Sequence, residues 1–184
     1  MPRTATRSRT TKETSIELSI DLDGTGTTAV STGIPFYDHM LDQLGRHGGF
    51  DLSVAAKGDL HVDGHHTIED TSIVLGQAFA EALGDKAGVR RFASGLYPLD
   101  EALVEVALDL SGRPFVHYEV DPPGVKILGD PPFDPQLAEE FWRAFATASA
   151  ITLHVVLVRG KNTHHIIEAS FKAVARALRD AVRL

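Results

Sequence analysis

The chain has 184 residues, of which 43% are hydrophobic and 23% charged, a composition typical of one globular domain. No apolar run reaches the roughly 20 residues of a membrane-spanning helix, and the N-terminal residues lack the apolar core of a signal peptide, so we expect a cytoplasmic protein. Because Cys is absent, disulfides, thiolate nucleophiles, Cys-type zinc sites and iron–sulfur clusters are excluded. The formal net charge of −7 argues against a general nucleic-acid binder.

The first half of the chain predicts a hairpin, a helix, a strand and a second helix, in that order. Residues 1–12 are polar and aperiodic, so we expect a mobile N-terminal arm in front of a single domain over 13–184. Apolar and polar residues alternate over 15–22, turn residues follow, and the chain returns over 27–33, which predicts a β-hairpin. Helical spacing then predicts helices over 35–49 and 65–84, with a strand over 50–58 between them.

The second half repeats this order of elements. Glu13 corresponds to Glu101 at an offset of 88 (101 − 13), and His65 corresponds to His164 at an offset of 99 (164 − 65). The proline-rich stretch 121–135 accounts for much of the difference between the offsets. We infer an internal duplication with repeats of about 13–88 and 101–184. It predicts an α+β domain with pseudo-twofold symmetry, in which mixed sheets are covered by helices.

Two predicted helices begin with a His pair followed by a carboxylate. His65 with Glu69, and His164 with Glu168, are four residues apart and therefore share a helix face, as in a two-ligand clip for a divalent ion. The adjacent His66 and His165 lie about 100° further round the helix, so we expect each of them to reach a second ion. A His at a helix start is often only a cap or a surface residue, but its recurrence at matching positions favours two metals, each bound by a His and a Glu of one repeat and a His of the other. Imidazole and carboxylate ligands suit Mn, Fe, Co or Zn without ranking them.

Other polar residues are candidates for the same site, although each alone is commonly a surface residue. His39 and Gln43 share a helix face, and Glu140 lies in the corresponding helix of the second repeat, so His39 and Glu140 could complete the two metal shells. Glu13 could act as a general base. Candidates for binding an anionic substrate are Arg91, Arg113 and Lys172.

Four long segments closely resemble the imidazoleglycerol-phosphate dehydratases of histidine biosynthesis, and the match extends from about residue 12 to residue 183. The segments are GIPFYDHMLDQLGRHGGFDL, HHTIEDTSIVLGQA, PLDEALVEVALDLSGRP and GKNTHHIIEASFKAVARALR. The resemblance implies a duplicated α+β fold with two four-stranded sheets, like domain 2 of ribosomal protein S5. It also implies two Mn²⁺ ions per active site, and sites formed between subunits of a 24-subunit shell that is assembled from trimers.

The resemblance also implies roles for individual residues. The metal ligands of the family fall on His39, His65, His66, Glu69, His164, His165 and Glu168. Substrate contacts fall on Glu13, Gln43, Arg91, Asp100, Arg113 and Lys172. The residues expected to take part in catalysis are Glu13, His39, His66, Glu69, His165 and Glu168.

The sequence departs from the family at two places. Glu140 stands where many members have a metal-binding His, so this shell would be rich in carboxylates or completed by water. The Ser-x-Lys-Gly tail that binds the substrate phosphate in the family is missing after Leu184, so either this sequence is truncated or Arg91, Arg113 and Lys172 bind the phosphate alone.

The implied reaction converts imidazoleglycerol phosphate to imidazole acetol phosphate. Two cations on the ring nitrogens would favour the imidazolate, whose electrons expel hydroxide to give a diazafulvene, and Glu13 would then remove the neighbouring proton. The resulting enol tautomerises to the product, while cationic side chains hold the phosphate. Two alternative functions are a dinuclear metallohydrolase and a nucleic-acid-binding module related to ribosomal proteins.

Overall fold

The computed structural model describes residues 2–124 and 126–184 as two similar sets of strands and helices. The first set is β1 (Thr4–Thr10), β2 (Thr14–Asp21), β3 (Thr28–Ser31), α1 (Pro35–Gly48), β4 (Asp51–Gly58) and α2 (His65–Leu83). The second set is β5 (Phe92–Leu99), β6 (Ala102–Asp109), β7 (Phe115–Glu119), α3 (Gln136–Ser149), β8 (Thr152–Arg159) and α4 (Thr163–Ala181).

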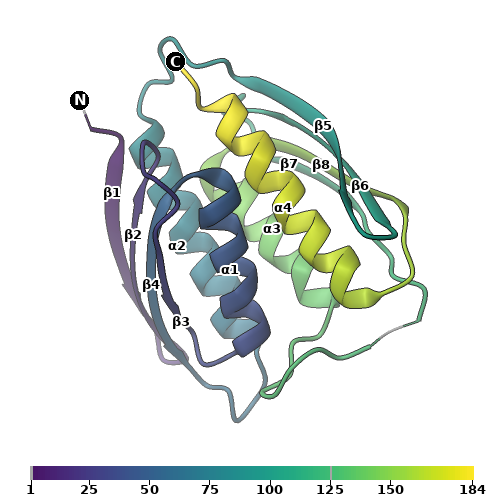
Figure 1. Ribbon diagram of the computed structural model, residues 1–184. Coiled ribbons are helices and arrows are strands. Elements are labelled where there is room, and N and C mark those ends of the chain that lie inside the picture. Colours follow the sequence, from purple (N-terminus) through teal and green to yellow (C-terminus); the bar gives the residue numbers. More distant parts are fainter. Residues whose placement is uncertain (1, 125) are drawn as a thin grey trace.

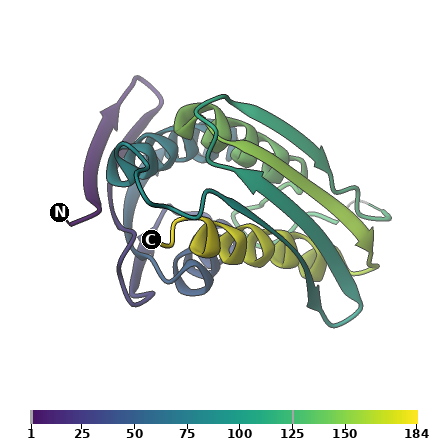
Figure 2. The same ribbon diagram turned by 90° about the horizontal axis from the view of Figure 1, so that it is seen from above.

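The two sets form two four-stranded mixed sheets with four helices between them (Figure 1). The first sheet has the order β1-β2-β4-β3 and the second β5-β6-β8-β7. Viewed from above, α1 and α2 lie against the first sheet, α3 and α4 against the second, and the helices meet in the middle as the pairs α1–α4 and α2–α3 (Figure 2). The predicted α+β class and the duplication are confirmed.

Neither predicted hairpin forms, because another strand lies between its two arms. β2 pairs antiparallel with β4, and β3 pairs parallel with β4 on its other side. The second half repeats this arrangement, with β8 between β6 and β7. Alternation of apolar and polar residues predicts strands but not their partners. Here α1 and α3 serve as crossover connections that allow β3 and β7 to run parallel to the next strand.

The N-terminal residues that we expected to form a mobile arm are ordered as an edge strand. β1 pairs with β2 in antiparallel register from Thr4 opposite Asp21 to Thr10 opposite Ser15. Arg7 and Arg9 reach across to α2, where they form ion pairs with Glu81 and Asp70. Only one residue of β1 is buried, so its sequence does not show the alternation that predicts a strand. Its pairing with β2 identifies it as an edge strand.

The corresponding edge strand of the second half, β5, was not predicted either. β5 pairs with β6 from Phe92 opposite Asp109 to Leu99 opposite Ala102, as β1 pairs with β2. Thr4 and Phe92, the first residues of β1 and β5, are separated by the same offset of 88 (92 − 4) that relates Glu13 to Glu101. The repeat therefore begins at the edge strand, about nine residues earlier than the sequence pattern indicated.

The core lies between each sheet and its helices and between the two helix pairs. Ile16, Leu18 and Ile20 of β2 alternate toward the helices, and their neighbours face outward. Trp142 of α3 is fully buried and packs against Phe171 of α4, with 4.8 Å between ring centroids. Within the described residues, none of the helices is both long enough and apolar enough to cross a membrane.

Candidate active site

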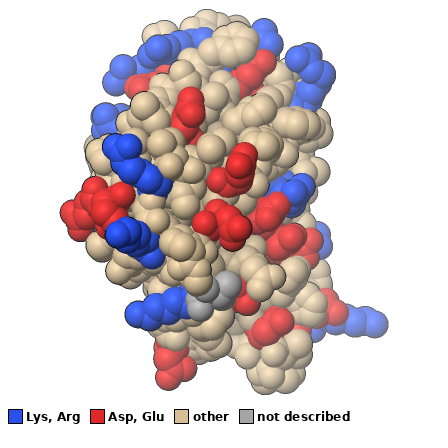
Figure 3. All heavy atoms as spheres, turned by 90° about the vertical axis from the view of Figure 1, so that its right-hand side faces the viewer, with Lys and Arg blue, Asp and Glu red and all other residues tan. Residues whose placement is uncertain are grey.

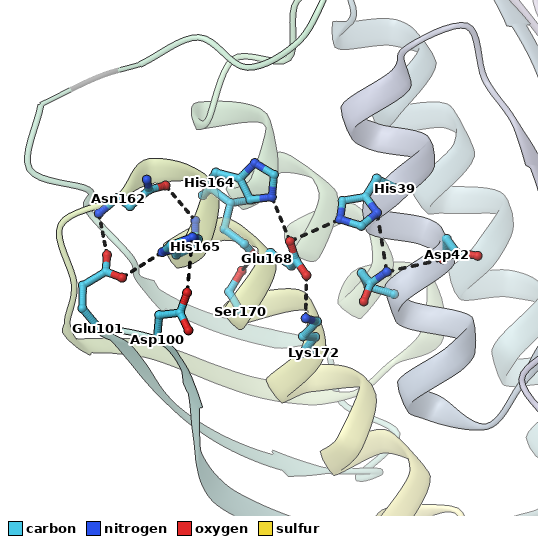
Figure 4. A network of polar contacts seen from close by, with 12 residues as sticks. His39, Asp42, Asp100, Glu101, Asn162, His164, His165, Glu168, Ser170 and Lys172 are labelled. Carbon is cyan, nitrogen blue, oxygen red and sulfur yellow. Dashed lines mark hydrogen bonds and ion pairs between the residues drawn. The ribbon is translucent and has the colours of Figure 1, made fainter.

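One cluster of possible metal ligands joins α1 to α4, and we call it the α1/α4 cluster. It contains His39, His164 and Glu168, whose ligand atoms all lie within 4.8 Å of one another. The distance to Glu168 Oε2 is 2.9 Å from His164 Nε2 and 3.2 Å from His39 Nε2 (Figure 4). His164 and Glu168 share a face at the start of α4, where the Asn162 side chain caps the helix by accepting the His165 N–H. His39 comes from the other repeat.

Glu168 is held as a carboxylate inside this cluster. Burial has the largest influence and raises its pKa, but hydrogen bonds from Lys172, His164 and His39 together lower that pKa to about 2. Lys172 Nζ lies 2.5 Å from Glu168 Oε1, whereas both imidazoles contact Oε2. The two oxygens therefore have separate partners, the Lys172 ammonium group on one side and two imidazole nitrogens on the other.

A second set of possible ligands lies along α2 and α3, with its atoms further apart than in the first, and we call it the α2/α3 cluster. His65 Nε2 is 3.8 Å from Glu69 Oε2 on α2, and the third member is Glu140 on α3. Glu140 and His65 both line a cavity of about 650 Å³, and Glu140 and Glu69 line a neighbouring cavity of about 430 Å³. Glu140 thus lies beside the clip of the first repeat.

The two clusters are related by the duplication. His39 corresponds to Glu140 at an offset of 101 (140 − 39), which also relates the starts of α1 and α3 (136 − 35). Lys172 corresponds to Ile73 at the offset of 99 (172 − 73) that relates the His pairs. The α2/α3 cluster therefore has a carboxylate in place of an imidazole and an apolar side chain in place of a cation. It is the more negative of the two.

The donors fit a divalent transition metal. The α1/α4 cluster offers two imidazole nitrogens and one carboxylate oxygen from two helices, a mixed set that suits Mn, Fe, Co or Zn. The described residues contain no Cys that would favour a softer ion. Three ligands leave coordination positions open for a substrate or for a residue of another chain.

Comparison with known proteins agrees with this geometry. The model of the family "Imidazoleglycerol-phosphate dehydratase" matches residues 32–178, which include both clusters. The chain belongs to the imidazoleglycerol-phosphate dehydratase family. It is a hydro-lyase that carries out the dehydration step of histidine biosynthesis. Family membership sets aside both the metallohydrolase and the nucleic-acid-binding alternatives.

Relatives and solved structures of this family match over nearly the whole chain. Imidazoleglycerol-phosphate dehydratase of Acidothermus cellulolyticus is 58% identical and covers 100% of this chain and 87% of its own length. The Gluconacetobacter diazotrophicus enzyme is 59% identical over 97% of this chain and 89% of its own. The Staphylococcus aureus crystal structure has a TM-score of 0.86 at 38% identity and covers 97% of both chains. The Pyrococcus furiosus structure, solved in complex with (S)-C348, has a TM-score of 0.82 at 35% identity, with 96% of this chain and 93% of that one covered.

In this dehydratase, the second His of each pair turns away from the clip of its own chain. His66 Nδ1 lies 2.8 Å from Asp59 Oδ2, and His165 Nδ1 lies 2.8 Å from Glu101 Oε2. These hydrogen bonds raise the pKa of both imidazoles. The clip formed by His164 and Glu168 is therefore contacted by an imidazole of the first repeat, and that imidazole belongs to His39 and not to His66. Sequence reasoning missed Asp59, whose only signal was an acidic residue directly after a predicted strand.

Two of the expected substrate-contact residues lie beside the α1/α4 cluster, and a third lies beside His165. Lys172 pairs with Glu168, and Gln43 Nε2 is 3.5 Å from His39 Nδ1. Asp100 Oδ2 is 3.7 Å from His165 Nε2. Glu13 is exposed in the turn between β1 and β2, where its N–H donates to Thr11 Oγ1, and its charge helps to raise the pKa of His66.

Arg91 and Arg113 lie at the opposite end of the molecule from the His pairs. The Arg91 N–H donates to the carbonyl of Ala181 at the C-terminal end of α4, and its side chain pairs with Asp109. Arg113 is exposed in the turn that follows β6. His165 and Ala181 are 16 residues apart on α4, or about 24 Å along the helix axis. One chain therefore does not bring these arginines to its own clusters.

Proposed function

We propose that the two clusters hold the two divalent cations of the dehydratase, with Mn²⁺ as the resident metal. The observation that carries this proposal is the convergence of His39, His164 and Glu168, from two helices and both repeats, on a space that one ion can fill. We assign His39, His164 and Glu168 to one cation and His65, Glu69 and Glu140 to the other. His66 and His165 belong to neither set and supply further ligands to the cations.

Glu140 is the residue in which this proposal departs from the family pattern. It occupies the position that corresponds to His39 and lies beside His65 and Glu69 along two cavities. A carboxylate is a harder ligand than an imidazole, so a shell with two carboxylates favours Mn²⁺ over softer ions. The added negative charge also offsets more of the charge of the cation.

The residues of the chain divide the work of the dehydration. Bound cations would favour the deprotonated, electron-rich form of the substrate's imidazole ring and so help the ring to expel the neighbouring hydroxide. Glu13, exposed and free of ion pairs among the described residues, removes the proton from the next carbon. Gln43 and Asp100, near the imidazoles of His39 and His165, orient the substrate. Arg91, Arg113 and Lys172 bind the phosphate.

Such a site requires more than one copy of the chain. Arg91 and Arg113 lie at the far end of α4, so they serve the clusters of a neighbouring subunit. The outer face of the second sheet supports self-association, because Phe92, Leu96, Phe115 and Val158 are exposed on its strands. Figure 3 shows this side of the molecule, where acidic side chains lie among larger uncharged areas. We propose the 24-subunit shell, built from trimers, with active sites between subunits and a cytoplasmic location suited to amino-acid biosynthesis.

A metal-removal experiment tests the proposal. Protein stripped with a chelator should lose turnover of imidazoleglycerol phosphate and regain it when two equivalents of Mn²⁺ per chain are added. Light scattering should show smaller particles after stripping, because cations that link subunits stabilise the assembly. Full turnover by metal-free protein would overturn the metal proposal, and an unchanged large particle would overturn the link between metal and assembly.

A further inference from the structure

We infer that Asp59 and Glu101 are positioning residues that orient the rings of His66 and His165 so that the Nε2 lone pair can bind a metal. The inference rests on the proposed metal function of these two histidines and goes beyond it by naming the groups that orient them. Each carboxylate contacts the Nδ1 atom of its imidazole at 2.8 Å. The arrangement occurs in both repeats, although the two carboxylates come from different elements.

Glu101 joins the β5–β6 turn to the start of α4. Its Oε2 contacts His165 Nδ1, while its Oε1 accepts the N–H groups of Lys161 at 3.2 Å and Asn162 at 2.7 Å (Figure 4). Both oxygens therefore have partners, and the carboxylate is held in one orientation. Asn162 in turn accepts the His165 N–H, so the backbone and the ring of His165 are anchored together.

Asp59 performs the corresponding task from a different place in the fold. It directly follows β4, whereas the residue that follows β8 is Gly160 and has no side chain. Oδ2 of Asp59 contacts His66 Nδ1, and its side chain is only 14% exposed. Its other oxygen is buried without a hydrogen-bond partner among the described residues, so contact with the imidazole is the main polar interaction of this side chain.

The use of Asp59 in the first repeat frees Glu13. Glu13 is the repeat-related counterpart of Glu101, yet no hydrogen bond or ion pair joins its side chain to His66 among the described residues. Asp59 occupies Nδ1 of His66 instead. The two repeat-related glutamates thus differ, because Glu101 orients a ring whereas Glu13 is exposed. This difference explains why Glu13, and not Glu101, is available as a base.

The chemical consequence is the choice of imidazole tautomer. An ionised carboxylate can only accept a hydrogen bond, so Nδ1 must be the donor in both pairs. A neutral imidazole protonated on Nδ1 has its lone pair on Nε2, which is the atom that can bind a metal. An amide in the same place can present its NH₂ group to Nδ1, which moves the proton to Nε2 and blocks metal binding there.

Metal titrations of isosteric variants test this inference. We expect Glu101→Gln and Asp59→Asn to bind Mn²⁺ about 10- to 100-fold more weakly than the unmodified protein. Free Mn²⁺ is measured by electron paramagnetic resonance as it is added to metal-stripped protein. Thermal unfolding of the metal-free proteins is recorded in parallel, and we expect Asp59→Asn to unfold within a few degrees of the unmodified chain.

The chain offers a matched pair of controls. Glu17 on β2 and Glu105 on β6 are exposed and related by the same offset of 88 (105 − 17), so Glu17→Gln and Glu105→Gln should leave Mn²⁺ affinity unchanged. Unchanged affinity in both test variants would overturn the positioning role while leaving the proposed metal centre intact. A lower unfolding temperature with unchanged affinity would also overturn it, since that result describes a purely structural contact. Failure of the unmodified protein to bind Mn²⁺ would overturn the metal proposal as well.

Discussion

His39 Nε2 lies 3.2 Å from Glu168 Oε2, although the two residues are 129 positions apart in the chain. The contact exists because α1 of the first repeat packs beside α4 of the second. The α1/α4 cluster therefore cannot form until both halves have folded and docked. A metal bound there favours the folded chain over the unfolded one.

Removing a metal ligand should separate metal binding from proton removal. We expect His39→Ala and Glu168→Ala to lower both Mn²⁺ content and turnover, because each removes one of three converging ligand atoms. Glu13→Gln should keep its Mn²⁺ and lose turnover, by roughly 10²- to 10⁴-fold if Glu13 is the base. Metal analysis and a dehydration assay of the same samples check both. If Glu13→Gln kept near-full activity, Asp100 would be the next candidate for the base.

Substitutions at Glu140 should show whether this carboxylate binds metal. If Glu140 is a ligand beside His65 and Glu69, the Glu140→His variant should still bind two cations per chain. Its metal preference should shift from Mn²⁺ toward softer ions, because an imidazole is a softer ligand than a carboxylate. Glu140→Ala should lower the occupancy of one of the two cations. Competition titrations with Mn²⁺ and Zn²⁺ measure both effects. Equal occupancy and equal preference in all three proteins would place Glu140 outside the metal shell.

Active sites shared between subunits should allow two inactive variants to complement each other. Arg91→Ala damages one end of the molecule and His164→Ala the other, so each alone should have little activity. In shells reassembled from an equal mixture, roughly a quarter of the sites should receive both intact parts, because each part comes from either variant at random. A mixture of His39→Ala with His164→Ala is the control, because these two lesions fall in the same cluster. No activity from the first mixture would contradict sharing.

The contact between α2 and α3 depends on Gly76. A Cβ atom at this position would lie 2.6 Å from the Phe145 carbonyl oxygen and 2.7 Å from the Ala148 Cβ, so the two helices would have to move apart. We expect Gly76→Ala to lower the free energy of unfolding by about 1 to 3 kcal/mol. The same movement separates Glu140 from His65, so Mn²⁺ affinity should fall as well. Urea denaturation checks the first effect, with the exposed Gln77→Ala as a control, and a wild-type midpoint for Gly76→Ala would contradict it.

Asp51 should make part of the stability depend on pH. Hydrogen bonds from the backbone N–H groups of Thr27 and Thr25 lower its pKa below the usual 3.8. A lowered pKa in the folded state contributes stability above pH 3.8, and this contribution is lost as the pH falls through the lowered value. Asp51→Asn should therefore be less stable at pH 7 and lose less stability below pH 4. Denaturation at pH 7, 4 and 3 measures this, with the exposed Asp121→Asn as a control. The prediction would be refuted if Asp51→Asn and the unmodified protein lost the same amount of stability between pH 7 and pH 3.

The sequence by itself determined the features that depend on local spacing. Apolar residues at helical intervals predicted all four helices, and the four-residue spacing of His164 and Glu168 predicted a contact that the structure shows at 2.9 Å. The duplication was also visible, because equivalent residues recur at constant offsets. These predictions succeed because a helix brings residues i and i+4 together whatever the rest of the chain does.

Only the tertiary structure decided which distant segments meet. Strand alternation says which face is buried but not which strand lies alongside, so the two hairpins were wrong and β1 and β5 were missed. The docking of α1 on α4 brings His39 to Glu168, and the end of β4 brings Asp59 to His66. The length of α4 keeps Arg91 away from its own clusters. All of these follow from the packing of the two halves, which spacing along the sequence does not encode.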